Sequence, residues 1–213
     1  MKKNVGIIIG VVVVVIAVIA IIFMFTNNGG SVGLDSSIQN EDNRSGNTTL
    51  DSDRVLVLYF SETGNTQKLA NIIYDEVGGD FRRIEPVEAY PTGDALFDYT
   101  EEEADNDARP EFKYLDINID DYDTIFVGYP IWWYQMPMIM YSFFDEYDLS
   151  GKTIVPFNTH DGSGDSGSYS DIEDLEPDAT VLDGLAIRGG DMESDQTDTV
   201  RNWLEDLGLV KRI

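Results

Sequence analysis

The sequence has no cysteine and a single histidine among its 213 residues. Without cysteine the chain can form no disulfide framework, offers no thiol nucleophile or thiolate metal ligand, and has no residue to carry the lipid of a lipoprotein anchor. One histidine is too few for an ordinary histidine-rich metal site. The chemistry of this chain must therefore come from other groups.

Basic residues are also scarce, since 14 lysines and arginines face 40 aspartates and glutamates and leave a formal net charge of −26. Nucleic-acid binding needs clustered lysine and arginine, so the composition excludes nucleic acid as a partner. The acidic residues are spread along the chain, which is typical of a solvated, self-repelling surface. The alternative is that this charge steers the protein toward a basic redox partner.

The one long uncharged run is Val5–Phe25, which follows Lys2 and Lys3. As a helix it would span about 30 Å, the thickness of the hydrocarbon core of a bilayer. The run is longer than the apolar region of a signal peptide and no small-x-small cleavage site follows it, so it predicts an uncleaved transmembrane anchor. The lysines before it predict that residues 1–4 lie in the cytoplasm and the domain lies outside, at the cell membrane.

Beyond this run, residues 26–53 are rich in Asn, Gly, Ser and Asp and predict a flexible linker. Residues 54–213 are expected to form one domain. The segments that read as strands are Val55–Phe60, Phe81–Val87, Asp123–Tyr129, Lys152–Phe157 and Thr180–Ile187. Helical patterns alternate with them, ending at Gly78 and spanning Ala95–Asp107, Met138–Tyr147, Tyr169–Leu175 and Asp195–Leu207. This alternation predicts an α/β fold with a doubly wound, five-stranded parallel sheet.

The first predicted strand passes directly into a polar turn, Ser61–Thr66, and then into a helix. Free N–H groups and the positive end of the helix dipole at such a turn attract an anion, most often a phosphate. The turn lacks the lysine of nucleoside-triphosphate loops and has no G-x-G-x-x-G pattern, so its neutral donors suit a phosphate monoester. The alternative is an ordinary strand-to-helix turn that is capped by Thr66.

An aromatic cluster, Pro130–Tyr134, follows the third predicted strand. It includes Trp132 and Trp133 and stands at the carboxyl end of a strand, where α/β sheets bind their ligands. Two indoles and a phenol at this position could sandwich a planar ring. The alternative is packing between the strand and the next helix, which we expect for one of the two tryptophans.

The loop that follows the fourth predicted strand, Asn158–Gly164, offers hydroxyls and flexible N–H groups. These donors could meet the polar edge of a bound ring. His160 could serve as a proton donor, or it could be a hydrogen-bonding or exposed residue. In the expected helix Ala95–Asp107, the run Glu101–Glu103 is interpreted as a solvated face rather than a metal site, because consecutive carboxylates point around a helix.

Three segments of the chain resemble the flavodoxin family. The turn Ser61–Thr66 resembles the S/T-x-T-G-x-T phosphate loop of flavodoxins, and Y-P-I-W-W at 129–133 and T-H-x-G-S-G at 159–164 resemble loops of a flavodoxin-like subgroup. The resemblance covers most of residues 54–213 and implies a sheet of order 2-1-3-4-5 that binds FMN. It carries FMN-binding roles over to Ser61, Glu62 through its backbone, Thr63, Gly64, Asn65, Thr66, Pro130, Ile131, Trp132, Trp133, Thr159, His160, Asp161 and Gly162.

This resemblance leads to three hypotheses about function. The first is a membrane-tethered electron-transfer flavoprotein that serves a redox partner protein or a small electron acceptor. The second is an FMN-dependent NAD(P)H:quinone-type reductase, which an extracytoplasmic location would disfavour because NAD(P)H is rare there. The third is a flavin-free binding module, for which the phosphate loop and the aromatic loop would have to be coincidental.

Overall fold

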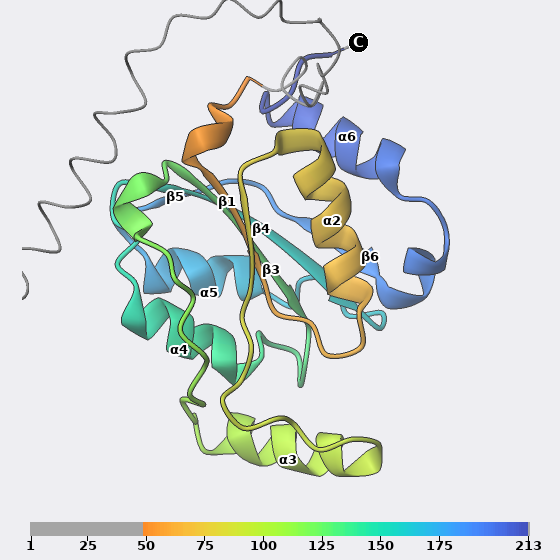
Figure 1. Cartoon of the computed structure of the whole chain (residues 1–213). Coiled ribbons are helices and arrows are strands. Elements are labelled where there is room, and N and C mark those ends of the chain that lie inside the picture. Colours follow the sequence, from red (N-terminus) through yellow and green to blue (C-terminus); the bar gives the residue numbers. More distant parts are fainter. Residues whose placement is uncertain (1–48, 213) are drawn as a thin grey trace, which may run out of the picture. The chain divides into compact units, whose positions relative to one another are not determined.

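The structure is a computed structural model that describes residues 49–212. In this part of the chain, helices cover both faces of a six-stranded sheet (Figure 1). The strands are β1 (Val55–Tyr59), β2 (Asp80–Arg83), β3 (Thr124–Pro130), β4 (Thr153–His160), β5 (Thr180–Val181) and β6 (Leu185–Arg188). The α-helices are α2 (Asn65–Val77), α3 (Asp94–Asp105), α4 (Met138–Glu146), α5 (Ser168–Leu175) and α6 (Thr197–Asp206). Short 3-10 helices are η1 (Ser52–Arg54), η2 (Ile119–Asp121) and η3 (Gly189–Glu193).

All strand pairs of this sheet are parallel, and the order is β2-β1-β3-β4-β5, with β6 also beside β4. The predicted α/β fold and the order 2-1-3-4-5 are thereby confirmed. From β1 the chain goes to β2 on one side and then to β3 on the other, so the winding reverses between β1 and β3. In open sheets of this kind, ligands bind at the carboxyl ends of the strands beside that reversal.

The last sheet position differs from the prediction of one strand over Thr180–Ile187. Two short strands, β5 and β6, pair with opposite ends of β4. Between them Gly184 lies against the ring of Tyr169, and a Cβ at this glycine would come within 2.3 Å of that ring. The carbonyl of the neighbouring Asp183 accepts a hydrogen bond from Nε1 of Trp203 at 2.9 Å. These contacts interrupt the strand, and they could not be predicted from the apolar residues of Thr180–Ile187.

Two apolar cores lie on opposite faces of the sheet, one under α2 and α6 and the other under α4 and α5. Strand β1 contributes alternate side chains to them, Val55, Val57 and Tyr59 to the first and Leu56 and Leu58 to the second. A parallel strand buried on both faces needs apolar residues at every position. This requirement explains why β1 was recognisable from the sequence.

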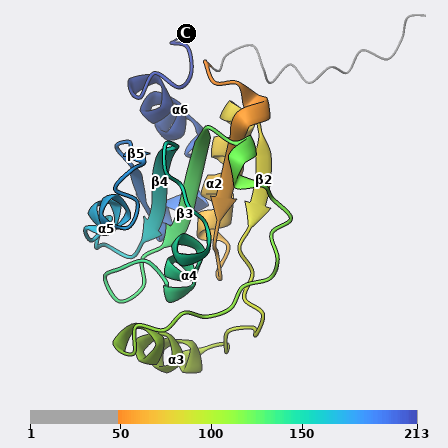
Figure 2. The ribbon, with the colours of Figure 1, turned by 90° about the vertical axis from the view of Figure 1, so that its left-hand side faces the viewer.

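Strand β2 forms an edge of the sheet, as predicted, but it ends at Arg83 rather than Val87. The chain then leaves the sheet until β3 begins. This connection, residues 84–123, is called the excursion below, and it contains α3. In both views α3 lies beyond the carboxyl ends of β1 and β3 (Figures 1 and 2). Near its base the two arms of the excursion form an antiparallel bridge between Pro86 and Phe112, and the N–H of Val87 donates to the carbonyl of Glu111 at 2.9 Å.

The predicted location in the cell membrane is corrected by the structure. Among residues 49–212, no helix is long and apolar enough to cross a bilayer. The longest α-helix of this part, α2, has 13 residues, whereas a spanning helix needs about 20. The predicted anchor at residues 5–25 lies outside the described residues, and so do the predicted cytoplasmic residues 1–4 and residues 26–48 of the predicted linker.

Candidate functional site

The turn after β1 leads into α2 without a side-chain cap on the helix. Gly64 is the N-cap residue and has a φ of 92°, a left-handed conformation that costs glycine little. Gly64 has no side chain to cap the helix, and within residues 49–212 the N–H groups of Asn65, Thr66 and Gln67 have no side-chain acceptor, so they are left for an outside acceptor. Together with the dipole of α2, these groups favour an anion at this point.

The hydroxyl groups of Ser61 and Thr66 in this turn are bonded within the protein and do not cap the helix. Thr66 is buried, and its hydroxyl shares a 2.8 Å hydrogen bond with the hydroxyl of Thr159, which lies near the end of β4. The Oγ of Ser61, also buried, accepts a hydrogen bond from the N–H of Gly64 at 3.1 Å. These hydroxyls therefore order the turn and tie it to the neighbouring strand while the helix N–H groups stay free.

Two residues next to the turn were not identified from the sequence. Arg83 donates from Nη2 to the carbonyl of Ser61 at 2.6 Å, because the register of β1 and β2 brings it level with Tyr59. Gly189 begins η3 after β6, and a Cβ there would lie 2.9 Å from Nδ2 of Asn65. The sequence marked these two residues only weakly. Arg83 appears as an arginine in an edge strand, and Gly189 as part of a glycine pair after the last strand.

The aromatic cluster after β3 forms a two-residue hairpin, the aromatic hairpin, over residues 132–135. Trp132 and Gln135 exchange two backbone hydrogen bonds, each of 3.0 Å. At the tip, Trp133 and Tyr134 have φ values of 51° and 62°, in the left-handed region that asparagine and glycine usually occupy in such turns. This tip leaves Trp133 39% exposed and Tyr134 78% exposed.

The two tryptophans of the aromatic hairpin have different surroundings. Trp132 packs edge-on against Phe60 and Tyr90, with ring centroids 5.3 and 5.5 Å apart, and adjoins the core under α4 and α5. Trp133 instead donates from Nε1 to Oγ1 of Thr100 on α3, at 3.0 Å. Trp132 therefore has the packing role expected for one of the pair, and Trp133 is the indole that remains more open.

A pocket of about 320 Å³ opens beside the aromatic hairpin. Its walls come from the hairpin, from α3 and from the loop after β4. The lining residues are Leu96, Phe97, Thr100, Ile131, Trp132, Trp133, Tyr134, Asp161 and Ser163. The contribution of α3 was missed because this helix reads as acidic and solvated, and its few apolar residues form no clear stripe.

The end of β4 joins the other two loops. The carbonyl of Thr159 accepts a hydrogen bond from the N–H of Ile131 at 2.8 Å, while its hydroxyl holds Thr66 as described above. Nδ1 of His160 accepts from the N–H of Gly162 at 2.9 Å, so this histidine orders the loop that follows it. Thr159 thus connects the phosphate-type turn to the aromatic side of the site.

The structure brings the predicted site residues to one edge of the sheet. The three segments are Ser61–Thr66, Pro130–Trp133 and Thr159–Gly162. Thr159 bonds to the first segment through its hydroxyl and to the second through its carbonyl. Asp161 lines the aromatic pocket, and its exposed carboxylate lies 3.6 Å from the guanidinium of Arg188. The arrangement offers free N–H donors at one end and an aromatic pocket at the other.

The run Glu101–Glu103 of α3 was expected to be solvated, but Glu103 is buried. Glu101 and Glu102 are exposed, as predicted, but Glu103 is only 9% exposed and accepts a hydrogen bond from the hydroxyl of Tyr90 at 3.1 Å. Burial raises the pKa of the Glu103 carboxyl. Burial and the neighbouring Glu103 also raise the pKa of the Tyr90 phenol. Helix α3 is therefore tied to the sheet side of the molecule by this bond and by the indole bond of Trp133.

These features define a doubly wound α/β protein whose candidate site suits a ligand with an anionic end and a flat end. The sequence model of the flavodoxin family matches residues 54–207. The chain therefore belongs to the flavodoxin family, and the resemblance that was inferred from its three loops is confirmed.

Solved structures agree with this assignment. A protein of Bacteroides eggerthii that is assigned as a flavoprotein is 32% identical, with a TM-score of 0.64 over 73% of this chain and 98% of that chain. Another protein with this assignment, from Bacteroides uniformis, is 29% identical, with a TM-score of 0.65 over 73% and 99% of the two chains. A flavoprotein of Lactobacillus acidophilus, solved in complex with FMN, is 21% identical and shares the fold, with a TM-score of 0.57 over 70% and 99%. A comparison with curated proteins found no match.

Proposed function

We propose that this domain binds FMN and acts in electron transfer. The observation that carries the proposal is the uncapped N-terminus of α2, which the bond between Thr66 and Thr159 joins to the strand beside the aromatic pocket. A phosphate at the helix N-terminus and a flat ring in the pocket are the two ends of an FMN molecule. The flavoprotein assignments of the two Bacteroides relatives and the FMN complex of the Lactobacillus protein support this interpretation.

The donor set suits the phosphate of FMN. The N–H groups of Asn65, Thr66 and Gln67 would donate to phosphate oxygens, and the dipole of α2 would favour their negative charge. Ser61 and Thr66 are held by bonds to other parts of the site, so the turn is already ordered before a ligand arrives. Ordering in advance reduces the entropic cost of binding.

At the ring end, the side chain of Trp133 would lie against the flavin and Trp132 would support it from the core. When bound, FMN supplies the redox chemistry, and the protein supplies binding, orientation and electrostatics. Phe97 and Tyr134 at the rim of the pocket are 60% and 78% exposed. They offer a surface through which a redox partner protein or a small acceptor could approach the ring.

The reductase hypothesis keeps one supporting observation. Leu96 and Phe97 on α3 give the aromatic pocket an apolar wall that could receive a flat substrate. The earlier argument against it depended on an extracytoplasmic location and no longer applies.

The proposal is tested by adding FMN to the purified full chain, removing the excess and recording the visible absorbance spectrum. A flavin spectrum that corresponds to about one FMN per chain is expected. A folded but colourless protein would contradict the proposal. NADH and NADPH are then added to the flavin-loaded protein in the presence of a soluble quinone. No oxidation beyond that of free FMN is expected for an electron carrier, whereas rapid turnover would establish the reductase.

A further inference from the structure

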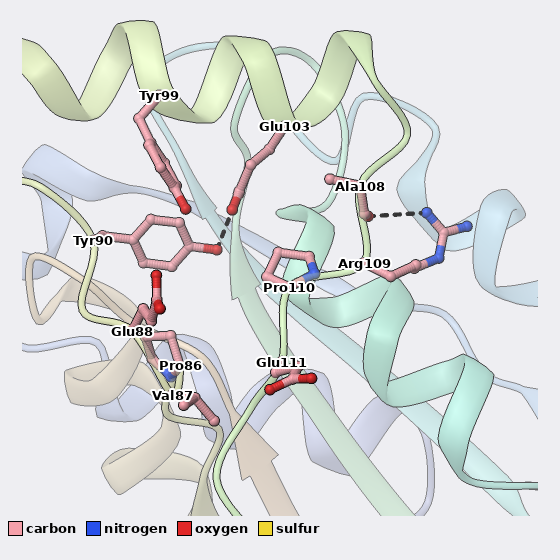
Figure 3. Close-up of a pocket in the computed structure, with 10 residues that line it drawn as sticks. All are labelled: Pro86, Val87, Glu88, Tyr90, Tyr99, Glu103, Ala108, Arg109, Pro110 and Glu111. Carbon is pink, nitrogen blue, oxygen red and sulfur yellow. Dashed lines mark hydrogen bonds between the residues drawn. The ribbon is translucent and has the colours of Figure 1, made fainter.

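A second pocket, of about 370 Å³, is lined by Tyr90, whose ring also packs edge-on against Trp132. Figure 3 shows the residues that line this pocket. Helix α3 forms one wall, and the two arms of the excursion between β2 and β3 form the rest. The side chains that matter for its chemistry are Glu88, Tyr90, Tyr99, Glu103, Arg109 and Glu111. Nothing in the proposed FMN site uses this pocket.

The carboxylates dominate the charge of this pocket. Glu88, Glu103 and Glu111 all line it, and Arg109 is the one cationic residue of the lining. The guanidinium of Arg109 is already occupied, because its Nε donates to Asp145 at 2.6 Å and its Nη1 to Asp107 at 2.7 Å. In Figure 3 this guanidinium points away from Glu103. The lining therefore carries an excess of negative charge, and its one cationic side chain is bonded to carboxylates that do not line the pocket.

Glu103 is the most informative of these carboxylates. It is nine-tenths buried, yet it has no ion-pair partner among residues 49–212. Its Oε2 accepts one hydrogen bond from the hydroxyl of Tyr90, at 3.1 Å, and its side chain lines the pocket. Burying a carboxylate without a cation is costly, so a positively charged group in the pocket would be strongly favoured.

The aromatic side chains add a second preference. The rings of Tyr90 and Tyr99 meet edge to face with centroids 5.8 Å apart, and Figure 3 shows both beside the carboxylate of Glu103. Aromatic faces attract organic cations and also bury apolar groups. Carboxylate and aromatic rings together favour an ammonium group on an apolar body over a bare metal ion.

We propose that this pocket is a second ligand site that binds an organic cation, with the ammonium group beside Glu103 and the apolar body against Tyr90 and Tyr99. The volume of about 370 Å³ accommodates a small ring with a short amine chain. The site does not depend on bound FMN, so it stands or falls separately from the proposed function.

The test titrates the full chain with 2-phenylethylammonium and, separately, with the neutral 2-phenylethanol, by calorimetry or NMR at fixed salt. The ammonium probe is expected to bind at least about tenfold more tightly than the alcohol, since the two differ mainly in charge. Glu103→Gln keeps the shape and an acceptor for Tyr90 and should remove most of this preference. Glu101→Gln, an exposed neighbour that makes the same charge change, should keep the preference intact.

Equal affinity of the two probes for the wild-type protein would overturn the proposal, as would a preference that survives in Glu103→Gln. Failure of both probes to bind would overturn it as well. Tyr99→Leu gives an independent check, because Tyr99 is 44% exposed and its loss should leave the fold intact. This variant is expected to weaken the ammonium probe several-fold while FMN binding stays unchanged.

Discussion

The two ends of the candidate site differ in kind, because one consists of backbone groups and the other of side chains. The anion end, Ser61–Gln67, has its N–H donors on the backbone at the start of α2, and the hydroxyls of Ser61 and Thr66 are bonded within the protein. The ring end is lined by exposed side chains on a two-residue turn and on α3, which would form the proposed binding surface. Backbone donors depend on the conformation of the turn, whereas the ring end depends on individual side chains. The two ends should therefore respond differently to substitution.

The largest difference is expected from changing the ligand rather than the protein. Riboflavin lacks the phosphate of FMN and cannot use the anion end. Hydrogen bonds to charged groups contribute about 1.5–3 kcal/mol each, so we expect riboflavin to bind about 100-fold more weakly or worse. Titration of the full chain by flavin fluorescence measures both affinities. Equal affinities would show that the anion end contributes nothing.

The two tryptophans should separate packing from ring binding. Trp132→Ala removes edge contacts with Phe60 and Tyr90, and we expect the free energy of unfolding to fall by about 2–3 kcal/mol. Trp133→Ala removes a side chain that is 39% exposed, and we expect FMN affinity to fall about tenfold with little loss of stability. Each variant is the control for the other.

Urea unfolding and FMN titration are measured on both variants in parallel. If they lose FMN affinity equally and neither loses stability, the assignment of separate roles is wrong. Trp133→Phe, which keeps a ring but no N–H group for Thr100, should recover most of the affinity that Trp133→Ala loses.

A smaller effect is expected from the hydroxyl pair that links the anion end to β4. Thr66→Val keeps the shape of the side chain but leaves the hydroxyl of Thr159 unpaired in a buried place, so we expect FMN affinity to fall about fivefold and stability to fall by about 1 kcal/mol. In the double variant with Thr159→Val, the loss of stability should be smaller than the sum of the two single losses. Additive losses would show that the bond contributes little.

The smallest effect concerns Glu103, which anchors α3 at the ring end. Folding raises the pKa of this carboxyl, so the folded protein holds the proton more tightly than the unfolded chain does. Its contribution to stability is therefore lost as the pH rises from the ordinary value for glutamate, about 4.3, through the raised value. Urea unfolding from about pH 4.5 to about pH 8 should show a smaller fall for Glu103→Gln than for the wild type. A variant that follows the wild-type curve would contradict this.

The sequence was sufficient for the fold because the central strands are buried on both faces. β1 and β3 read as mainly apolar runs, and in the structure every residue of β1 and all but the last residue of β3 are buried. The division of the last strand was not predictable, since it depends on contacts of Gly184 and Asp183 with side chains distant in sequence.

The site shows the same limit. The three loops were predictable because each follows a recognisable strand, but the pocket wall on α3 and the inward turn of Glu103 were not. Both depend on how the excursion folds back over the strand ends, and an acidic helix with few apolar residues does not specify that. The different surroundings of Trp132 and Trp133 follow from the hairpin backbone, which their shared residue type does not reveal.

The left-handed tip of the aromatic hairpin bears on how this protein could be engineered. Replacing Trp133 and Tyr134 with Asn and Gly would place residues suited to positive φ at the tip and should stabilise the turn. The same change would remove both exposed rings from the proposed flavin pocket. Selection for thermal stability alone would therefore favour variants that are more stable but bind the ligand more weakly. Screens on this protein should measure ligand retention together with the melting temperature.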